Sequence, residues 1–388
     1  MRNWTAKRLQ PFGTTIFAEM TALAKKHDAI NLAQGFPDFN GPAAMIEAAY
    51  EAMQSGDNQY SRSAGHPRLV ESIARFTQAH FGRTVDPESE VAVTSGATEG
   101  IAAAMLGILD PGDEVILFEP FYDSYLAIAE LAGAVPRLVT LKAPDFRLDA
   151  HDLASVFTNR TKLVVLNTPH NPTGRVFDRT ELGVLADLCI QNDVAVISDE
   201  VYEHITFTED GAIPFSSVPG MEERTLTLSS AGKTFSFTGW KIGWSTGPSE
   251  LVSAQVAAHQ FLTFCAATPL QVAVAAALDN LPLDYYFNLK AQYRLRRDLL
   301  AEALETSGFQ PIIPEGTYFI LADFANLSDQ TDREFARTLT EKIGVASVPP
   351  SVFYRDPPPE AQHFLRFSFS KERSTLEEAA KRLSALRR

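Results

Sequence analysis

From about residue 89 to residue 247 the sequence alternates short apolar runs with longer segments of helical periodicity. Runs without a polar break, such as residues 163–166, are typical of strands that are covered on both faces. The alternation therefore predicts an α/β fold in which helices cover both faces of a mostly parallel sheet. The expected strands lie at residues 90–94, 114–118, 137–141, 162–167, 194–198, 225–228 and 242–246, and the clearest helical segments at 98–109, 122–132 and 180–191.

The pattern changes after Asp284. A long charged segment at 285–306 predicts one helix, and a second helix is expected at 375–387. Between them, the runs 311–324, 344–350 and 364–369 are rich in β-forming residues. We therefore expect a smaller α+β domain, formed by residues 285–388 together with an N-terminal arm, residues 1–40. Residues 41–284 would form the large domain.

Composition narrows the class of protein. The chain has 388 residues, is 45% hydrophobic and 21% charged, and carries a formal net charge of -14. These values are those of an ordinary globular enzyme or binding protein. Nucleic acids and acidic membranes are bound by clustered Lys and Arg, so the negative charge argues against both as general partners.

Neither cysteines nor terminal signals suggest export. Cys189 and Cys265 are the only cysteines and have no metal-ligand spacing, so we expect a reducing compartment and no metal site. The first ten residues are basic but lack the apolar core of a signal peptide, and no run of eighteen apolar residues occurs. We therefore expect a cytoplasmic protein.

The most informative segment is residues 230–241, which follows the expected strand at 225–228. It contains Ser230, Lys233 and Lys241 among glycines and aromatic residues. A partly desolvated lysine has a lowered pKa and can form a Schiff base with an aldehyde, while a second lysine and a hydroxyl can bind a phosphate. The combination suits pyridoxal phosphate. The segment alone is equally compatible with a turn that carries two surface lysines.

Three further segments follow expected strands, where ligands of parallel sheets bind. Residues 95–100 form a small-residue turn before a helix, which is either a plain connection or a phosphate-binding helix start. Asn171 is either a turn former or an amide donor. Asp199 ends an apolar run, where a carboxylate is costly to bury unless a cation such as a pyridinium nitrogen partners it; Tyr202 would lie near the same ring. The alternative for Asp199 is a helix cap.

Two more side chains have chemistry of interest. Arg366 lies between aromatic and apolar neighbours on an expected strand, so it would either clamp a carboxylate or form a structural ion pair. Tyr122 follows another strand and could stack on a heteroaromatic ring, or pack in the core.

Taken in order, these segments resemble one family. The sequence is similar to the fold-type I, class I/II aminotransferases, which depend on pyridoxal phosphate, over essentially its full length. Within that family it is most similar to the kynurenine aminotransferase / glutamine transaminase K group and to bacterial methionine or N-succinyldiaminopimelate aminotransferases. The resemblance implies an aspartate aminotransferase-like fold with a seven-stranded sheet in the large domain. It is carried by Gln34-Gly35-Phe36-Pro37-Asp38, Gly96-Ala97-Thr98, Glu119-Pro120-Phe121-Tyr122-Asp123, Asn171-Pro172-Thr173-Gly174, Asp199-Glu200-Val201-Tyr202, Ser230-Ala231-Gly232-Lys233 and Arg366.

The resemblance also implies a role for each matching residue. Lys233 would carry the cofactor as an aldimine and later move a proton between substrate and cofactor. Asp199 would pair with the pyridinium nitrogen, and Tyr202 and Asn171 would hold the ring oxygen. Tyr122 would stack on the ring. The catalytic residues implied are Lys233, Asp199 and Tyr202.

The resemblance also implies which residues bind the phosphate and which bind the substrate. The residues implied to hold the phosphate are Ala97, Thr98, Ser230 and Lys241. Tyr60 matches a tyrosine that reaches the phosphate of a neighbouring subunit, which implies a homodimer with shared sites. Arg366, with Asn171 and the backbone of Gly35, would bind the substrate α-carboxylate, and Phe17 would face the substrate.

At three positions this chain has a different residue type from that found in some related aminotransferases. Aspartate aminotransferases have arginine at the position of Lys241, which suits the kynurenine-type group. That group often has tyrosine where this chain has Thr98 and tryptophan where it has Phe17. The preference of these relatives for particular substrate side chains therefore cannot be transferred directly to this chain.

The expected reaction moves an amino group between an α-amino acid and a 2-oxo acid. Phe17, Tyr60 and either Phe261 or Phe264 suggest glutamine, methionine or an aromatic amino acid as the donor. The alternatives are an N-succinyldiaminopimelate aminotransferase and a cysteine-conjugate β-lyase. A remote alternative, a non-catalytic regulator that binds pyridoxal phosphate, would need a DNA-binding module, and the resemblance begins by about residue 8. No G-x-G-x-x-G or P-loop follows a strand, so a nucleotide-binding protein is not expected.

Overall fold

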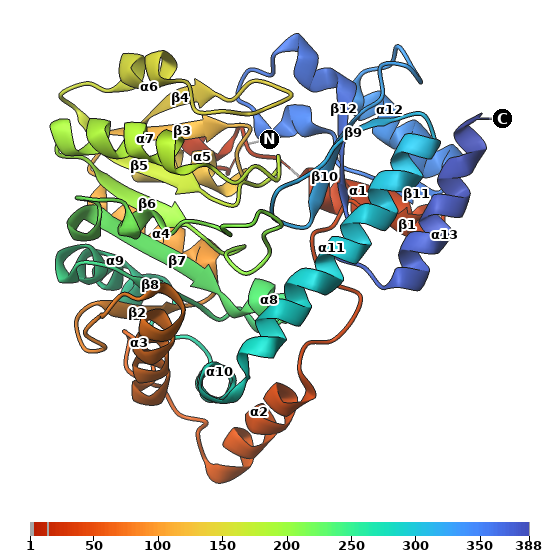
Figure 1. The fold of residues 1–388 in the computed structure, drawn as a ribbon. Coiled ribbons are helices and arrows are strands. Elements are labelled where there is room, and N and C mark those ends of the chain that lie inside the picture. Colours follow the sequence, from red (N-terminus) through yellow and green to blue (C-terminus); the bar gives the residue numbers. More distant parts are fainter. Residues whose placement is uncertain (1–3, 14, 388) are drawn as a thin grey trace.

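The computed structural model describes residues 4–13 and 15–387, and its largest element is a seven-stranded sheet. The strand order is β2-β8-β7-β6-β5-β3-β4 (Figure 1). Among the described strands of this sheet, β8 alone runs opposite to the other six, so the mostly parallel sheet predicted from the sequence is confirmed. The strands are β2 (Val91–Thr94), β3 (Glu114–Glu119), β4 (Val135–Thr140), β5 (Thr161–Asn167), β6 (Ala195–Asp199), β7 (Thr225–Ser230) and β8 (Gly243–Thr246).

Helices cover both faces of this sheet. Along β5, Val164 and Leu166 pack on one side with α6 and α7, whereas Leu163 and Val165 pack on the other with α4 and α5. All four side chains are buried, which explains why the sequence shows an unbroken apolar run rather than an alternation. The helices are α4 (Ala97–Ile108), α5 (Ser124–Ala132), α6 (Ala150–Val156), α7 (Arg179–Gln191) and α9 (Ser249–Leu262).

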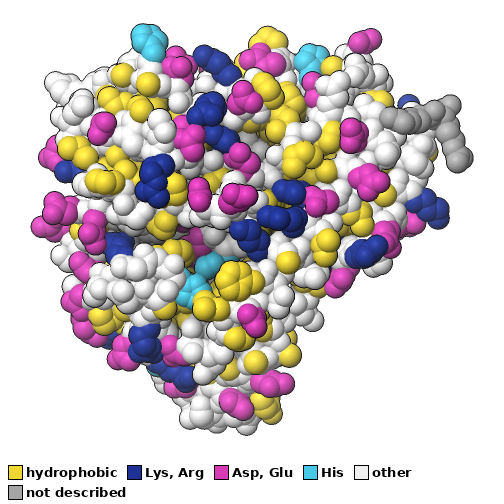
Figure 2. Space-filling model, in the orientation of Figure 1, with side chains coloured by type: hydrophobic (Ala, Val, Ile, Leu, Met, Phe, Trp, Pro, Cys, Tyr) yellow, Lys and Arg dark blue, Asp and Glu magenta, His cyan; other side chains and the backbone are white. Residues whose placement is uncertain are grey.

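Three further helices, α2 (Ala43–Ser55), α3 (Pro67–Phe81) and α10 (Thr268–Asn280), pack together beside the β2 edge, where α2 projects from the body (Figure 1). None of the helices in the described ranges is long and apolar enough to cross a membrane. Acidic and basic side chains are interspersed over the face shown in Figure 2.

A second, antiparallel sheet of order β12-β10-β9 forms the smaller unit. It is built from β9 (Gln310–Ile312), β10 (Phe319–Asp323) and β12 (Phe364–Ser368), and is flanked by α11 (Leu283–Thr306), α12 (Asp332–Thr338) and α13 (Arg373–Leu383). The N-terminal segment joins it, because β1 (Ile30–Asn31) pairs with β11 (Val345–Ala346) and α1 (Ile16–Lys26) adds Met20 and Ala24 to its core. These contacts agree with the expected grouping of residues 1–40 and 285–388, which stays a prediction as a division into domains.

Three expected elements are shorter than the sequence suggested. The run 311–324 is two strands, because Thr317 adopts φ +63° and the loop packs so closely that a Cβ at Gly316 would lie 2.6 Å from Cβ of Pro169. The run 344–350 keeps only β11, since a 3₁₀ turn starts at Pro350. The last helix ends at Leu383, where a 3₁₀ turn begins.

Candidate active site

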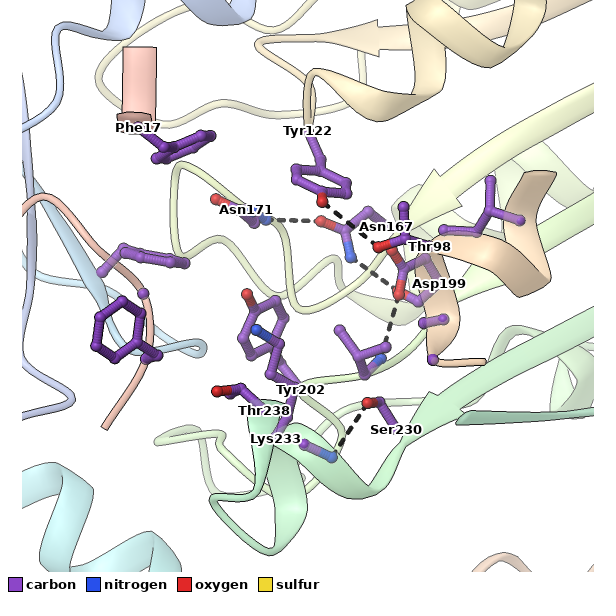
Figure 3. Close-up of a pocket in the computed structure, with 18 of the residues that line it drawn as sticks. Phe17, Thr98, Tyr122, Asn167, Asn171, Asp199, Tyr202, Ser230, Lys233 and Thr238 are labelled. Carbon is purple, nitrogen blue, oxygen red and sulfur yellow. Dashed lines mark hydrogen bonds between the residues drawn. The ribbon is translucent and has the colours of Figure 1, made fainter. Parts of the chain in front are cut away.

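A cavity of about 400 Å³ lies where the carboxyl ends of β5, β6 and β7 face the smaller sheet. Figure 3 shows Phe17 and Tyr122 toward one end of this space and Ser230 and Lys233 toward the other. Ligands of open parallel sheets bind at such strand ends. The predicted site residues that line the cavity are Phe17, Gly35, Ala97, Thr98, Tyr122, Asn171, Asp199, Tyr202, Ser230, Lys233, Lys241 and Arg366.

Lys233 lies in the short helix α8 (Ala231–Thr234), directly after β7. Ser230 caps this helix, with its hydroxyl accepting from the backbone N–H of Gly232 at 3.2 Å. The Nζ of Lys233 donates to the hydroxyl of Tyr318 at 2.7 Å. It has no ion pair with a carboxylate of the described residues. Burial therefore dominates and lowers the pKa of Lys233 to about 8, so that part of this amine is neutral and nucleophilic near pH 8.

Asp199 is the last residue of β6 and is buried. Its Oδ2 accepts from the hydroxyl of Tyr125 at 2.5 Å, and its backbone oxygen accepts from Nδ2 of Asn167 at 2.8 Å. Burial raises the pKa of Asp199, although the Tyr125 hydrogen bond opposes this. No ion pair joins its carboxylate to a cationic side chain in the described ranges. A positive charge of a ligand opposite Asp199 would therefore stabilise the ionised form. The residues that follow Asp199 form turns rather than a helix, so the helix-cap alternative is wrong.

The turn before α4 presents an anion-binding surface. Gly96 has φ +78°, and the helix starts at Ala97 with free backbone N–H groups. A Cβ at Gly96 would lie 3.1 Å from Nζ of Lys241, so a side chain here would fill the space beside this ammonium group. Burial and then the charge of Lys233 lower the pKa of Lys241. Two cations near a helix start favour an anionic ligand.

Arg366 is a buried cation on β12, with 1% of its surface exposed. Its Nη1 donates to Oδ1 of Asn171 at 2.9 Å and its Nη2 to the oxygen of Ala33 at 3.3 Å. The guanidinium carbon lies 3.9 Å from the ring centre of Phe319 and 4.9 Å from that of Phe353. Burial lowers the pKa of Arg366 to about 10, which still leaves it charged at neutral pH.

Among the described residues, Arg366 has no carboxylate in direct ion-pair contact. Its buried Nε has no hydrogen-bond partner among them. The alternative of a structural ion pair for Arg366 is therefore wrong. An unpaired buried donor is costly, so a carboxylate ligand would satisfy both the charge and the free N–H.

Three aromatic residues considered for the site do not line the cavity of this chain. Tyr60, Phe261 and Phe264 are 83%, 86% and 49% exposed, and Tyr60 packs edge-on against Phe264 at 5.2 Å. Their exposure agrees with the expected role of Tyr60 at a neighbouring subunit, which stays a prediction.

The structure adds residues that the sequence reasoning did not select. Asn167 and Tyr125 contact Asp199, and Phe319 stacks on Arg366. Tyr318 contacts Lys233. Asn167 and Tyr125 lie beside selected motifs, so their positions were a usable signal. Tyr318 and Phe319 lie in an ordinary β-like run, which carries no such signal.

Comparison with known proteins identifies the family. Residues 27–383 match the model of the aminotransferases of class I and II, and the chain belongs to that family. It is 46% identical to a probable N-succinyldiaminopimelate aminotransferase of Mycobacterium tuberculosis, over 98% of both chains. It is 39% identical to a kynurenine–oxoglutarate transaminase of Dictyostelium discoideum, over 99% of this chain and 96% of the relative.

A solved structure gives the same result. The crystal structure of Escherichia coli YbdL, reported as having a methionine aminotransferase function, superposes with a TM-score of 0.95 at 41% identity and covers 99% of this chain and all of the other. The fold is that of the aspartate aminotransferases. The protein is thus an aminotransferase, and both the predicted class and the predicted similarity to these subgroups are confirmed.

Proposed function

We propose that the chain binds pyridoxal phosphate in the 400 Å³ cavity and uses it to move an amino group between an α-amino acid and a 2-oxo acid. One observation carries this proposal: a lysine of lowered pKa and a buried carboxylate, which forms no ion pair with a described side chain, line the same cavity. An aldehyde that carries both a phosphate and a basic ring nitrogen is complementary to this pair of groups.

The described residues fit each part of this cofactor. Its phosphate would lie against the N–H groups of Ala97 and Thr98, near Ser230 and Lys241. Asp199 would face the ring nitrogen, and Tyr122 one face of the ring. Asn171 and Tyr202, which also line the cavity, would hold the ring oxygen. When bound, the cofactor supplies an electron sink for the carbanion that forms when an amino acid loses its α-proton.

The chain's own residues then do three things. Lys233, neutral in part near pH 8, accepts the α-proton at Nζ and returns it to another carbon. Asp199 supplies a negative charge in a buried setting, where it keeps a nearby cation protonated. Tyr125 holds the carboxylate of Asp199 in place through its 2.5 Å hydrogen bond.

Arg366 gives the site its selectivity for α-carboxylates. Its free Nε and uncompensated charge would be satisfied by a carboxylate, and Asn171 fixes the plane of the guanidinium through Nη1. The rings of Phe319 and Phe353 keep water from the guanidinium faces. The binding energy gained there would orient the α-carbon toward Lys233.

The substrate side chain would lie near Phe17 and Phe36, which line the cavity. Of the described residues that line it, the cations are Lys233, Lys241 and Arg366, and the cofactor and the α-carboxylate would engage all three. An uncharged side chain therefore fits best, as in methionine, glutamine or an aromatic amino acid. N-Succinyldiaminopimelate is the second candidate, favoured by the 46% identity to the mycobacterial relative, and it needs a further cation for its distal carboxylates.

A panel of amino donors separates these candidates. Purified enzyme would be mixed with each donor and with pyruvate, 2-oxoglutarate or glyoxylate, and the absorbance of the bound cofactor followed in half-reactions. We expect conversion with methionine, glutamine or aromatic amino acids. Conversion with N-succinyldiaminopimelate alone would replace this assignment, and release of pyruvate and ammonia from a cysteine conjugate without an acceptor would indicate a β-lyase. The absence of any conversion would refute transamination.

We further propose a homodimer with shared active sites. The α2 residues Ile46, Tyr50 and Met53, spaced three or four apart, are 45%, 62% and 46% exposed, and Tyr60 is exposed nearby in sequence. Such an apolar stripe is typical of a surface that is covered in an oligomer. Sedimentation of the purified chain should give twice its mass of 42.6 kDa.

A complementation experiment tests the sharing itself. If Tyr60 serves the partner's site, an inactive Tyr60→Ala chain mixed with an inactive Lys233→Ala chain forms hybrid dimers in which one site is complete. Activity recovered on mixing would support shared sites, and no recovery despite hybrid formation would refute them.

The remaining assignments belong to the same proposal. A two-domain division at residues 40 and 284 is supported by the core that β1, α1 and the C-terminal elements share, although Val201 to Phe207 of the large domain also pack into it. Limited proteolysis that cuts first near these positions would test it. A cytoplasmic location is supported by the two free cysteines, Cys189 and Cys265, and cell fractionation tests it.

A further inference from the structure

We propose that Tyr318 is a positioning residue that holds the free amine of Lys233 and turns its lone pair toward the substrate α-carbon. The inference rests on the proposed function, because it concerns the proton that Lys233 moves. It is carried by one chain of contacts, in which Lys233 donates to Tyr318 at 2.7 Å and Tyr318 donates to the backbone oxygen of Gly35 at 2.5 Å.

The ring of Tyr318 is fixed in one orientation. The residue is fully buried just before β10, with 0% of its surface exposed. Its ring packs edge-on against Tyr202 at 5.2 Å and Phe319 at 4.8 Å, and stacks on Tyr293 at 5.9 Å. A hydroxyl on a ring packed in this way has little freedom to leave its partners.

The direction of each hydrogen bond follows from the single proton of a phenol. The Gly35 oxygen is an acceptor only, so the Tyr318 proton points to it and the oxygen lone pairs face Lys233. Burial raises the pKa of Tyr318, which keeps the hydroxyl protonated at neutral pH. Tyr318 therefore accepts an N–H from Lys233 and does not itself act as a base.

This arrangement orients the neutral amine. A neutral lysine amine has two N–H groups and one lone pair, and committing one N–H to Tyr318 removes most of its rotational freedom. The lone pair is then directed away from Tyr318, and Lys233 itself lines the cavity. Proton transfer depends on this alignment, so the hydrogen bond would speed the step without contributing to substrate affinity.

The same hydroxyl connects two parts of the site. Gly35 lines the cavity in the segment whose neighbour Ala33 accepts from Nη2 of Arg366. Gly35 approaches the aromatic residues so closely that a Cβ there would lie 2.5 Å from the ring of Phe319. Tyr318 therefore ties the amine to the segment that lies beside the proposed carboxylate site, which fixes the distance between base and substrate.

Two measurements on Tyr318→Phe test this inference. The variant keeps the ring and removes only the hydroxyl, and Tyr293→Phe is its matched control, because Tyr293 is buried and stacks on the same ring, and its hydroxyl is not the partner of Lys233. If Tyr318→Phe fails to fold, as judged by circular dichroism, a fluorinated tyrosine at position 318 keeps the shape and weakens the acceptor.

The first measurement uses the full-length chain freed of cofactor. Acetic anhydride labels neutral amines, so the pH at which Lys233 is half labelled, found by peptide mass spectrometry, reports its pKa. An acceptor stabilises the ammonium form, so its loss should lower the half-labelling pH by about one unit. The control should behave as the wild type does.

The second measurement uses the holoenzyme with α-deuterated and ordinary amino acid. For Tyr318→Phe we expect kcat to fall about tenfold, the value of one hydrogen bond, with a larger deuterium isotope effect and an unchanged KM. The inference stands only if both the labelling pH and kcat change, and a wild-type value for either overturns it. If the wild type and Tyr293→Phe lack transamination as well, the proposed function fails instead, and the labelling experiment still tests the contact.

Discussion

The hydroxyl of Tyr125 lies 2.5 Å from Oδ2 of Asp199, and so joins helix α5 to the end of strand β6 at the floor of the cavity. Both residues are buried, and burial raises the pKa of the Asp199 carboxyl while the Tyr125 hydrogen bond opposes that rise. The pair keeps a carboxylate in an apolar position where only a cationic ligand would fully stabilise it.

Asp199→Asn tests what that carboxylate contributes. The variant keeps the shape and loses the charge, so we expect cofactor to remain bound while turnover falls roughly 100- to 1,000-fold, as for other preorganised buried charges. Cofactor content by absorbance and kcat in steady state provide the check. Tyr125→Phe, which keeps the charge and removes one hydrogen bond, should lose only about tenfold. A near-normal rate for Asp199→Asn would show that its charge is not needed.

Arg366→Ala tests the carboxylate site. Removing a buried cation that would make charge-assisted hydrogen bonds should raise KM roughly 100-fold for amino acids and 2-oxo acids alike. Arg366→Lys should not restore it, because an ammonium group lacks the planar fork. Arg373→Ala, at a side chain that is 79% exposed, serves as the control. An unchanged KM would mean that Arg366 only supports the packing of Phe319 and Phe353.

The lowered pKa of Lys233 predicts a pH dependence of cofactor uptake. Only the neutral amine attacks an aldehyde, and the pKa of Lys233 is about 8 in the chain. The rate at which cofactor-free chain takes up pyridoxal phosphate should rise about tenfold per pH unit below 8 and level off above it. Stopped-flow absorbance from pH 6 to pH 9 measures this. A rate that stays flat over the range would place the reactive amine elsewhere.

Two buried glutamates outside the site predict how stability changes with pH. Burial raises the pKa of Glu203 to about 8 and that of Glu200 to about 7, from an ordinary value of 4.5. At these two carboxyl groups the folded chain therefore binds more protons than the unfolded chain between these values, so their contribution to the free energy of unfolding should fall as pH rises from about 5 to about 8.

Glu203→Gln should remove part of this fall. The variant would match the wild type near pH 5 and exceed it near pH 9, on the order of a few kcal/mol, as measured by urea denaturation. Glu341→Gln, at an exposed position, should have no such effect. Parallel stability profiles for Glu203→Gln and wild type would show that Glu203 ionises freely in the folded chain.

Much of the fold and of the candidate site could be predicted because several site residues lie next to strands that the sequence pattern reveals. The strands of the large sheet are short β-rich runs bounded by turns; Asp199 ends one of them, and Lys233 and Asn171 lie in the connections just after two others. The end of a strand and the edge of the sheet are the same place in a parallel fold, so a residue's position in sequence predicts its position in the site.

The rest depends on contacts between distant segments. Tyr318 reaches Lys233 only because the smaller sheet packs over the strand ends, whereas Phe319 reaches Arg366 because β10 pairs with β12. No spacing in the run 311–324 indicates either contact. The same run was expected to be one strand, and the positive φ of Thr317 divides it. For Tyr60 the sequence resemblance predicts more than the single chain can show. The residue is 83% exposed in this chain, and its proposed partner lies in another subunit.

Lys233 is the residue that would carry the cofactor, and every other role proposed for the site depends on it. Borohydride reduction of the native enzyme, followed by digestion and mass spectrometry, should find one pyridoxyl group, on the peptide that contains Lys233, and Lys233→Ala should show neither the group nor measurable turnover. A label on Lys241 or another lysine, or transamination that survives in Lys233→Ala, would contradict it.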